Sequence, residues 1–424
     1  MKIHCTPDRG SFDQLAGLNI LLFGPRTGLS EGGAGCGISR VIQRKKLCPN
    51  QRAWDLMSLA LSVVSADLAS PRGRSPDGWT REFDLTVAVQ DVDFWNTQVS
   101  TIQKYLAFLT TDIWRVRFSG NGYLHRAPHR PTFLPEEEVL LLSGGLDSLV
   151  GAIDFASGGR RALHVSHLVR GDGSKQRKFA AALGDPTHHL QMNHDANVPG
   201  QEATPTQRAR SIAFLSYGVL AATTLGVYRD GAVVRLNACE NGFIAINPPL
   251  TPLRLGSLST RTMHPIGLSL FQQILDSADL KVQVENPYRL KTKGEMMVEC
   301  LDQATLQSLG PKSTSCGRFL RYGGKHCGRC VPCLIRRAAF RKWGHQDTTY
   351  YVFDDLSIVD VNHAGYDDVR ATLMAGLEVQ EVGLDPWLGT TLCSPLIREV
   401  PLLKGVVERG LQEVNEFLSD CGVQ

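Results

Sequence analysis

The chain has no long hydrophobic run. Its nearest candidate, residues 212–228, is interrupted by serine, threonine and glycine, so it falls short of the roughly 18 uninterrupted apolar residues of a membrane-spanning helix. The N-terminus, Met1–Arg9, also has no apolar core of signal-peptide length. We therefore expect a soluble, cytoplasmic protein without a membrane partner.

A strong excess of charge is also absent. Lysine and arginine number 45 and aspartate and glutamate 42, which gives a formal net charge of +3. So weak a charge gives no indication of a nucleic-acid partner, which would need a marked basic field. The 42% hydrophobic content supports a large core, and 424 residues suggest two or three domains.

The cysteines do not form the pattern of a secreted disulfide framework. They number 11, an odd count, and four of them gather in one short segment, which indicates a reduced compartment. Two overlapping Cys-x-x-Cys steps and an upstream cysteine supply the four thiolates of a tetrahedral Zn²⁺ site and leave no position for water. We therefore predict a structural zinc knuckle over residues 316–333, with redox chemistry or free thiols as alternatives. The predicted ligands are Cys316, Cys327, Cys330 and Cys333.

One stretch predicts a nucleotide site. The apolar run Val139–Leu142 has strand length and leads into a small-residue turn, after which apolar residues recur at helical spacing. A helix start carries unpaired amides and partial positive charge, so this turn can bind an anion. Glycines allow close approach of a phosphate, and serines add donors. The stretch is Leu142, Ser143, Gly144, Gly145, Leu146, Asp147 and Ser148.

The aspartate in this turn indicates a metal. The carboxylate of Asp147 repels phosphate unless a cation lies between them, so we predict Mg²⁺ there. The stretch lacks the Gly-Lys-Ser/Thr ending of a Walker-type loop, which disfavours transfer of the terminal phosphate. The full Ser-Gly-Gly-Leu-Asp-Ser string resembles the pyrophosphate loop of the ATP pyrophosphatases, which split ATP into AMP and pyrophosphate. On its glycines alone, the turn could be an ordinary strand-to-helix connection.

Apolar periodicity divides the chain into three regions. Residues 1–134 are expected to form an N-terminal α/β accessory domain, with helices over 55–68 and 94–109 and strands over 83–89 and 113–118. Within it, the glycine-rich segment 24–42 matches no phosphate motif and is predicted to be a mobile loop. A proline-rich linker leads into the central domain, residues 135–345. Residues 346–424 are expected to form a helical C-terminal extension that includes an amphipathic helix over 399–418.

The central domain alternates strand and helix from Glu136 onward, which predicts an α/β fold with a doubly wound parallel sheet. Ligands bind at the carboxyl ends of strands in such sheets, which places residues 143–148, 167–172 and 240–243 on one rim. The segment 241–265 has little periodicity and is expected to cover the substrate. Strands are predicted over residues 139–142, 162–168, 188–192, 232–239 and 282–284, and a long helix over 206–227.

The pyrophosphate loop and the four-cysteine knuckle together resemble the 7-cyano-7-deazaguanine synthases, the QueC family, over about residues 136–345. Arg210 matches the arginine of the family's Pro-Gly-Arg-Asn step, Cys239-Glu240 its Cys-Glu step and Lys293-Gly294-Glu295 its Lys-x-Glu segment. The resemblance implies an adenine nucleotide alpha hydrolase-like fold with ATP, Mg²⁺ and structural Zn²⁺. It also implies adenylation of 7-carboxy-7-deazaguanine, followed by replacement with nitrogen, first as amide and then as nitrile.

The chain departs from the family at residues 169–174 and 241–246, and it is longer than the ordinary synthase at both ends. The enlarged form resembles the QueC-like proteins of bacterial anti-phage defence systems of the Qat type. For that group the implied reaction stops at the amide, and the favoured acceptor is the N-terminal amine of a partner protein. The alternatives are a nitrile-forming synthase that uses ammonia, a tRNA-modifying adenylator and a catalytically silent nucleotide-binding scaffold.

The resemblance assigns roles to single residues. The loop, Leu142 to Ser148, would bind ATP, with Asp147 acting through Mg²⁺. Arg210 and Lys293 would stabilise charge, since a lysine at a helix start beside the rim can neutralise departing pyrophosphate. For Lys293, a solvated surface position is the alternative. The residues assigned to the guanine-like ring are Glu240, Asn241 and Phe243.

Overall fold

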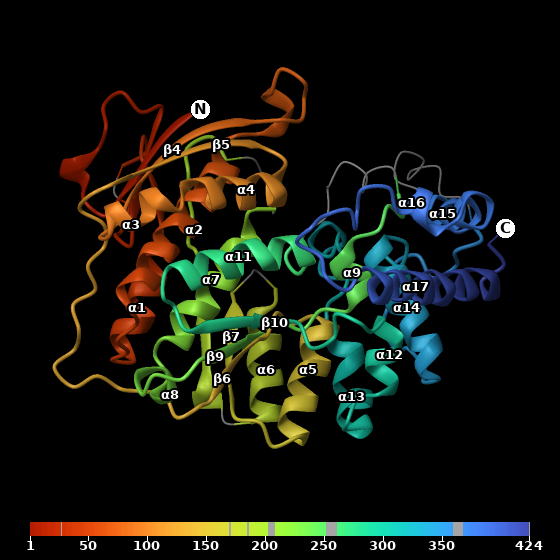
Figure 1. The fold of residues 1–424 in the computed structure, drawn as a ribbon. Helices are drawn as coiled ribbons and strands as arrows, with labels where there is room; N and C mark the ends of the chain where they lie inside the picture. The colour runs from red at the N-terminus through yellow and green to blue at the C-terminus, as the bar shows by residue number, and fades with distance from the viewer. Residues whose placement is uncertain are drawn as a thin grey trace.

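The computed structural model describes residues 1–26, 28–168, 171–184, 186–201, 208–251, 261–358 and 368–423. Its described residues form an α/β architecture with two five-stranded sheets in which all neighbouring strands are parallel (Figure 1). The strand orders are β3-β2-β1-β4-β5 and β10-β9-β6-β7-β8. Numbered along the chain within each sheet, both orders read 3-2-1-4-5. The prediction of a parallel α/β sheet is confirmed, and a second sheet of the same order precedes it.

The first sheet carries its helices on one face (Figure 1). Along β5 buried and exposed residues alternate, so the opposite face is open to solvent at this edge of the sheet, whereas β1 to β3 are mostly buried on both faces. Charged pairs between β4 and β5, Arg115–Glu82 and Arg117–Asp84, lie on this open edge. The strands are β1 (Lys2–Thr6), β2 (Leu18–Leu22), β3 (Gly32–Ala34), β4 (Glu82–Ala88) and β5 (Ile113–Ser119). The helices are α1 (Cys36–Arg44), α2 (Gln51–Ala69), α3 (Val92–Thr97) and α4 (Val99–Thr110).

The prediction of a mobile loop over residues 24–42 is wrong. The described part of this segment contains β3 and most of α1. Its glycines mark close packing: a Cβ at Gly32 would collide with Ile20, and one at Gly35, whose φ is +82°, would collide with Leu61. Glycine thus serves a buried, crowded edge of the sheet here. The predicted helix over 94–109 is likewise divided at Gln98 into α3 and α4.

The second sheet is covered on both faces. Val139 and Leu141 of β6 share a core with α7, whereas Leu140 and Leu142 share another with α5 and α6. All five predicted strands are confirmed in position, but the predicted long helix breaks after Ala222, and residues 206 and 207 lie outside the described residues. The strands are β6 (Glu138–Leu141), β7 (Ala162–His167), β8 (His189–Met192), β9 (Val234–Asn237) and β10 (Val282–Glu285). The helices are α5 (Leu146–Ser157), α6 (Gly173–Leu183), α7 (Arg210–Ala222), α8 (Gly226–Arg229) and α11 (Pro265–Ser277).

The two sheets share one central layer of helices. In Figure 1, α2 and α4 of the first sheet lie against α7 and α11 of the second, and a single hydrophobic core joins them. The edge strand β3 also pairs with the segment after β8, because Gly33 and Asn197 exchange two backbone hydrogen bonds of 2.9 Å. The predicted N-terminal and central regions are therefore packed as one body over these elements.

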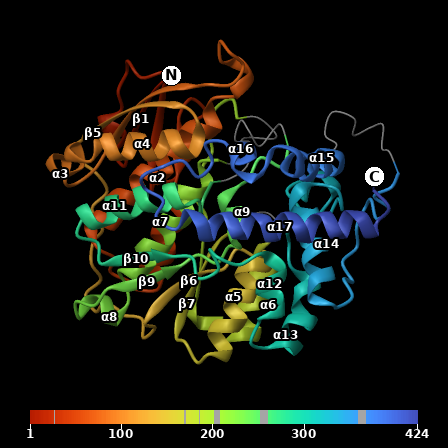
Figure 2. The ribbon, with the colours of Figure 1, turned by 45° about the vertical axis from the view of Figure 1, so that its right-hand side comes forward.

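Over the residues that the structure describes, seven further helices lie toward the C-terminus. The amphipathic helix predicted over 399–418 is confirmed as α17, which runs along α9 and α14 (Figure 2). The segment predicted to be structureless over 241–265 begins with a helix, and its residues 252–260 lie outside the described residues. These helices are α9 (Gly242–Ile246), α12 (Lys293–Val298), α13 (Gln303–Leu309), α14 (Val331–Trp343), α15 (Asp368–Val382), α16 (Leu384–Leu388) and α17 (Val400–Asp420). Among the described helices, none is both long and apolar enough to cross a membrane.

Candidate functional site

The predicted phosphate loop lies at the carboxyl end of the central strand. The strand β6 is flanked by β7 on one side and β9 on the other, so the chain reverses its order across the sheet at this point. In open α/β sheets this switch point is where ligands bind. Gly144 has a φ of +87°, a backbone conformation that favours glycine, and Gly145 caps α5. Leu142 and Leu146 are buried and anchor the two ends of the loop.

The two serines of the loop hold its shape. The hydroxyls of Ser143 and Ser148 lie 2.9 Å apart, and the Ser143 hydroxyl accepts from the Gly145 amide at 3.1 Å. The Ser148 hydroxyl donates to the Gly145 carbonyl at 3.0 Å and accepts from the Ser143 amide at 3.2 Å. These bonds are mutually compatible when Ser143 donates to Ser148. The serines therefore order the turn whose amides lie at the start of α5.

Asp147 receives donors from two distant segments. Its Oδ2 accepts from the backbone amide of Asn241 at 3.1 Å and from the Asn241 side-chain Nδ2 at 2.7 Å. Its Oδ1 forms an ion pair with the Lys293 ammonium. The exposed fractions of the two charged side chains are 12% for Asp147 and 5% for Lys293, so Lys293 is not a solvated surface lysine. The structure thus brings together three of the residues predicted for the site.

A further lysine, Lys175, lies beside the loop and was missed by the sequence analysis. Lys175 on α6 contacts the hydroxyl of Thr314 and lies 3.7 Å from the carboxylate of Asp172. The Thr314 amide donates to the Gly144 carbonyl at 3.0 Å, so Thr314 joins this lysine to the loop. Burial lowers the pKa of Lys175, and the neighbouring Asp172 opposes that effect. The predicted rim segment, 167–172, ended just before this residue.

Arg210 begins α7 at the same end of the sheet. Its pKa is lowered by burial, an effect that the negative charge of Asp172 opposes. Arg210 lies near His167 at the end of β7 and His194 after β8, whose rings are 5.1 Å apart. Burial, together with the positive charge of the nearby arginine, lowers the pKa of His194 to about 4. Both imidazoles are therefore neutral near pH 7, and Arg210 supplies the positive charge of this group.

Of the residues predicted to bind the guanine-like ring of the substrate, Phe243 is packed in the core. Phe243 is 1% exposed and packs against Gly410 of α17, so its ring has no free face for stacking. Asn241 is fully buried, caps α9 through its Oδ1 and holds Asp147. Glu240 is half-buried, and its backbone exchanges two hydrogen bonds with the Asn286 side chain. Within this group Asn241 belongs to the loop site, whereas Phe243 belongs to the core, because α9 turns its ring toward the C-terminal helices.

The four predicted zinc ligands converge. Their sulfur atoms all lie within 4.8 Å of one another, and all four residues are buried. The amides of Arg318 and Cys327 each donate to the sulfur of Cys316 at 3.3 Å, and the Cys330 amide donates to that of Cys327 at 3.3 Å. Such N–H donors favour thiolates, so this cluster could hold a structural metal such as zinc. The cluster extends into the first turn of α14, which Cys330 caps and which contains Cys333, and Thr314, two residues before Cys316, bonds to the phosphate loop.

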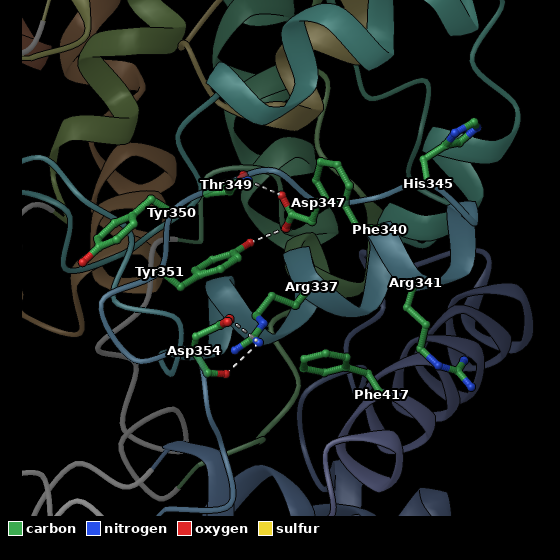
Figure 3. A pocket seen from close by; sticks show the side chains of 10 residues that line it. All are labelled: Arg337, Phe340, Arg341, His345, Asp347, Thr349, Tyr350, Tyr351, Asp354 and Phe417. Atoms are coloured by element: carbon green, nitrogen blue, oxygen red, sulfur yellow. Dashed lines mark hydrogen bonds and ion pairs between the residues drawn. The ribbon is translucent and has the colours of Figure 1, made fainter.

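A separate hollow of about 500 Å³ lies between α14, α17 and residues 345–354 (Figure 3). Arg337 in this hollow is paired with Asp354 at 3.0 Å, and Arg341 is paired with Glu416 at 2.6 Å and with Asp420. These arginines already have carboxylate partners, and none of the residues predicted for the site lines the hollow.

No protein-family model matches this chain, and no curated protein matches it. The class that the structure defines is therefore a general one. The described residues form an α/β protein with two five-stranded parallel sheets and four buried cysteines that could hold a structural metal such as zinc.

Proposed function

We propose that the protein is an ATP-dependent ligase of the ATP pyrophosphatase class, with the pyrophosphate-loop fold of the QueC-like enzymes. The observation that carries the proposal is the convergence on Asp147, where a loop at the switch point of a parallel sheet meets Lys293 and Asn241. A turn with only a structural role has no need of a buried lysine paired to the first turn of its helix.

The loop would bind the phosphates of ATP. The start of α5 offers backbone amides and partial positive charge, and Gly144 and Gly145 keep the approach clear of side chains. Two lysines contact this loop region: Lys293 pairs with Asp147, and Lys175 contacts Thr314, whose amide donates to the Gly144 carbonyl. Two ammonium groups in these positions suit the charge that develops on departing pyrophosphate.

Asp147 would hold the magnesium ion. Over the described residues, Lys293 is the one hydrogen-bond or ion-pair partner of its Oδ1. This oxygen therefore keeps a lone pair for a hard cation. Mg²⁺ bound there would offset phosphate charge. Carboxylate oxygen is the donor that this ion prefers, and the residues present fit it.

The substrate proposal is 7-carboxy-7-deazaguanine, on the basis of the family resemblance. A carboxylate oxygen would attack the α-phosphorus of ATP, forming an acyl adenylate and releasing pyrophosphate. An amine nitrogen would then attack the acyl carbon, AMP would leave with the bonding electron pair, and the nitrogen would lose one proton to form an amide. An α-amino group, with a reference pKa near roughly 8, is more often neutral at pH 7 than a lysine side chain.

The proposed acceptor is the N-terminus of a partner protein in an anti-phage defence system. A protein acceptor needs more docking surface than ammonia does. The first sheet, with its exposed and charged β4–β5 edge, and the helices α15 to α17 are the parts of the chain that exceed the ordinary synthase. They are available for that role.

The test is a reaction with ATP, Mg²⁺, 7-carboxy-7-deazaguanine and each protein encoded beside this one. We expect AMP and pyrophosphate, and the mass of the base added as an amide to one neighbouring N-terminus. Release of ADP and phosphate would contradict the class of enzyme. Accumulation of free 7-cyano-7-deazaguanine with ammonia, and no modified protein, would favour the ordinary synthase.

A further inference from the structure

The C-terminal helix α17 reaches both segments that hold Asp147. It packs along α9, which Asn241 caps, and along α14, whose first turn contains Cys333 of the cysteine cluster (Figure 2). It also bonds to the start of α12, which carries Lys293. No residue of α17 belongs to the site predicted from sequence, because the family resemblance ends near residue 345.

The first connection runs from Glu413 to Lys293. Glu413 is buried, and its Oε1 accepts from the hydroxyl of Thr292 at 2.5 Å. Thr292 caps α12 in a reciprocal capping box with Glu295, so its oxygen also accepts from the Glu295 amide at 3.1 Å. Arg409 of α17 holds the Glu295 carboxylate at 2.5 Å. The first turn of α12, from which Lys293 reaches Asp147, is thus fixed by two side chains of α17.

The second connection runs from Gly410 to Asn241. Gly410 faces the ring of Phe243 so closely that a Cβ at this position would collide with three ring carbons. Phe243 lies on the first turn of α9 and shares a hydrophobic core with Val406 and Val407. Asn241 caps that same turn and binds Asp147 through its amide and side chain. Close packing at Gly410 therefore fixes the donor of the second carboxylate oxygen.

We propose that α17 is a positioning element of the phosphate-loop site. Glu413 and Gly410 set the two segments that engage the two oxygens of Asp147, so turnover depends on how this C-terminal helix is docked. The kinetic test of this inference rests on the proposed function, whereas a second test, by backbone hydrogen exchange, needs only the structure. Neither residue touches the reacting groups, so both act through Lys293 and Asn241.

The kinetic test compares Glu413→Ala and Gly410→Ala with two controls on the same helix. Glu408→Ala and Leu402→Ala each replace a side chain of α17 that is exposed. We expect kcat for AMP formation to fall about 10- to 100-fold in the two test variants, with little change in KM for ATP, since small displacements of reacting groups cost rates of this size. Glu413→Gln keeps an acceptor for Thr292 and should restore most of the turnover.

Backbone hydrogen exchange separates this inference from the proposed function. The amides of Asn241 and Glu295 should exchange faster in Glu413→Ala or Gly410→Ala than in the controls, which should match the wild type. If the wild type forms no AMP, the proposed function fails, and exchange alone then decides the positioning role. Turnover and exchange equal to those of the controls would overturn the inference. If Gly410→Ala does not fold, the Glu413 variants decide.

Discussion

Asp147 is held by contacts that its neighbours in sequence do not reveal. Ser143 and Ser148 order the loop locally, whereas Asn241 and Lys293 arrive from segments that follow the fourth and fifth strands of the sheet. At this scale the residue types of the loop indicated an anion site. The identity of the partners depended on the fold, because Lys293 and Asp147 are 146 positions apart.

Removing the carboxylate should destabilise the protein as well as stop turnover. Asp147→Ala leaves the Lys293 ammonium, which is 5% exposed, without its counter-charge. Breaking one side of a buried ion pair costs about 3–5 kcal/mol, so we expect a loss of that order in the free energy of unfolding by urea. The double variant Asp147→Ala, Lys293→Met should recover part of the loss. Equal stability of the single variant and the wild type would contradict the buried pair.

Glu413 should make stability depend on pH. Burial raises its pKa from 4.5 to about 7, Glu295 repels it, and Thr292 and Lys342 favour its charged form. A raised pKa means that the folded state binds the proton more tightly, so this stabilisation is complete below about pH 4.5 and is lost as the pH rises through about 7.

The free energy of unfolding of the wild type should therefore fall relative to Glu413→Gln between pH 4.5 and pH 8. The fall should be on the order of 3 kcal/mol, since the pKa of Glu413 rises from 4.5 to about 7 on folding. Unfolding by urea at several pH values measures it. A constant difference between the two proteins would show that Glu413 titrates as an exposed carboxylate does.

At the scale of elements, long periodic segments were predictable and short crowded ones were not. The helices α2 and α17 and the strands of the second sheet follow their apolar patterns closely. The strands β1 to β3 are five residues or fewer, which is too short to show a clear period, and β3 consists of Gly-Gly-Ala and so has no β-branched residue. Thr314 and Lys175 meet the loop only through tertiary packing, which no local pattern encodes.

The glycines of the first sheet offer a direct test of that crowding. Gly35 and Gly78 both have positive φ, at +82° and +70°, but a Cβ at Gly35 would collide with Leu61 and one at Gly78 would meet nothing within 4 Å. Backbone strain of about 1–2 kcal/mol applies to alanine at both sites, and overpacking adds about 1–3 kcal/mol at Gly35 alone. Chemical denaturation should show Gly35→Ala to be the less stable variant by that margin. Equal losses would mean that the edge of the sheet accommodates the methyl group.

The cysteine cluster should account for the metal content of the protein. Purified protein should carry about one zinc per chain, and Cys330→Ser should lose it along with much of its solubility, since metal binding and local folding are coupled. Cys393→Ser, at an exposed cysteine outside the cluster, should keep it. Elemental analysis measures both. Freshly purified wild type without zinc would refute the assignment.

At the scale of the whole molecule, the first sheet is part of the same packed body as the second. The helices α2 and α4 of the predicted N-terminal domain pack directly on α7 and α11. Buried Arg208 also crosses from the segment before α7 to the Thr110 carbonyl at the end of α4, at 3.1 Å. One continuous hydrophobic core joins the two sheets, so unfolding either sheet would expose core residues of the other.

The two sheets should therefore unfold in one cooperative transition. Tryptophans 54, 79, 95 and 114 lie in the first region, and Trp343 and Trp387 lie toward the C-terminus. A variant with Trp343→Phe and Trp387→Phe reports the first region by fluorescence, while far-ultraviolet circular dichroism reports helices of the whole chain. We expect the two signals to share one midpoint in urea, as a two-state transition requires.

Phe271→Ala in α11 should move both midpoints together, because it opens a cavity in the shared helix layer. The ring of Phe271 lies 5.5 Å from that of Tyr105 of α4, and the expected loss in the free energy of unfolding is about 3–5 kcal/mol. Two separated midpoints would instead mean that the first sheet is an independent domain that docks on the second.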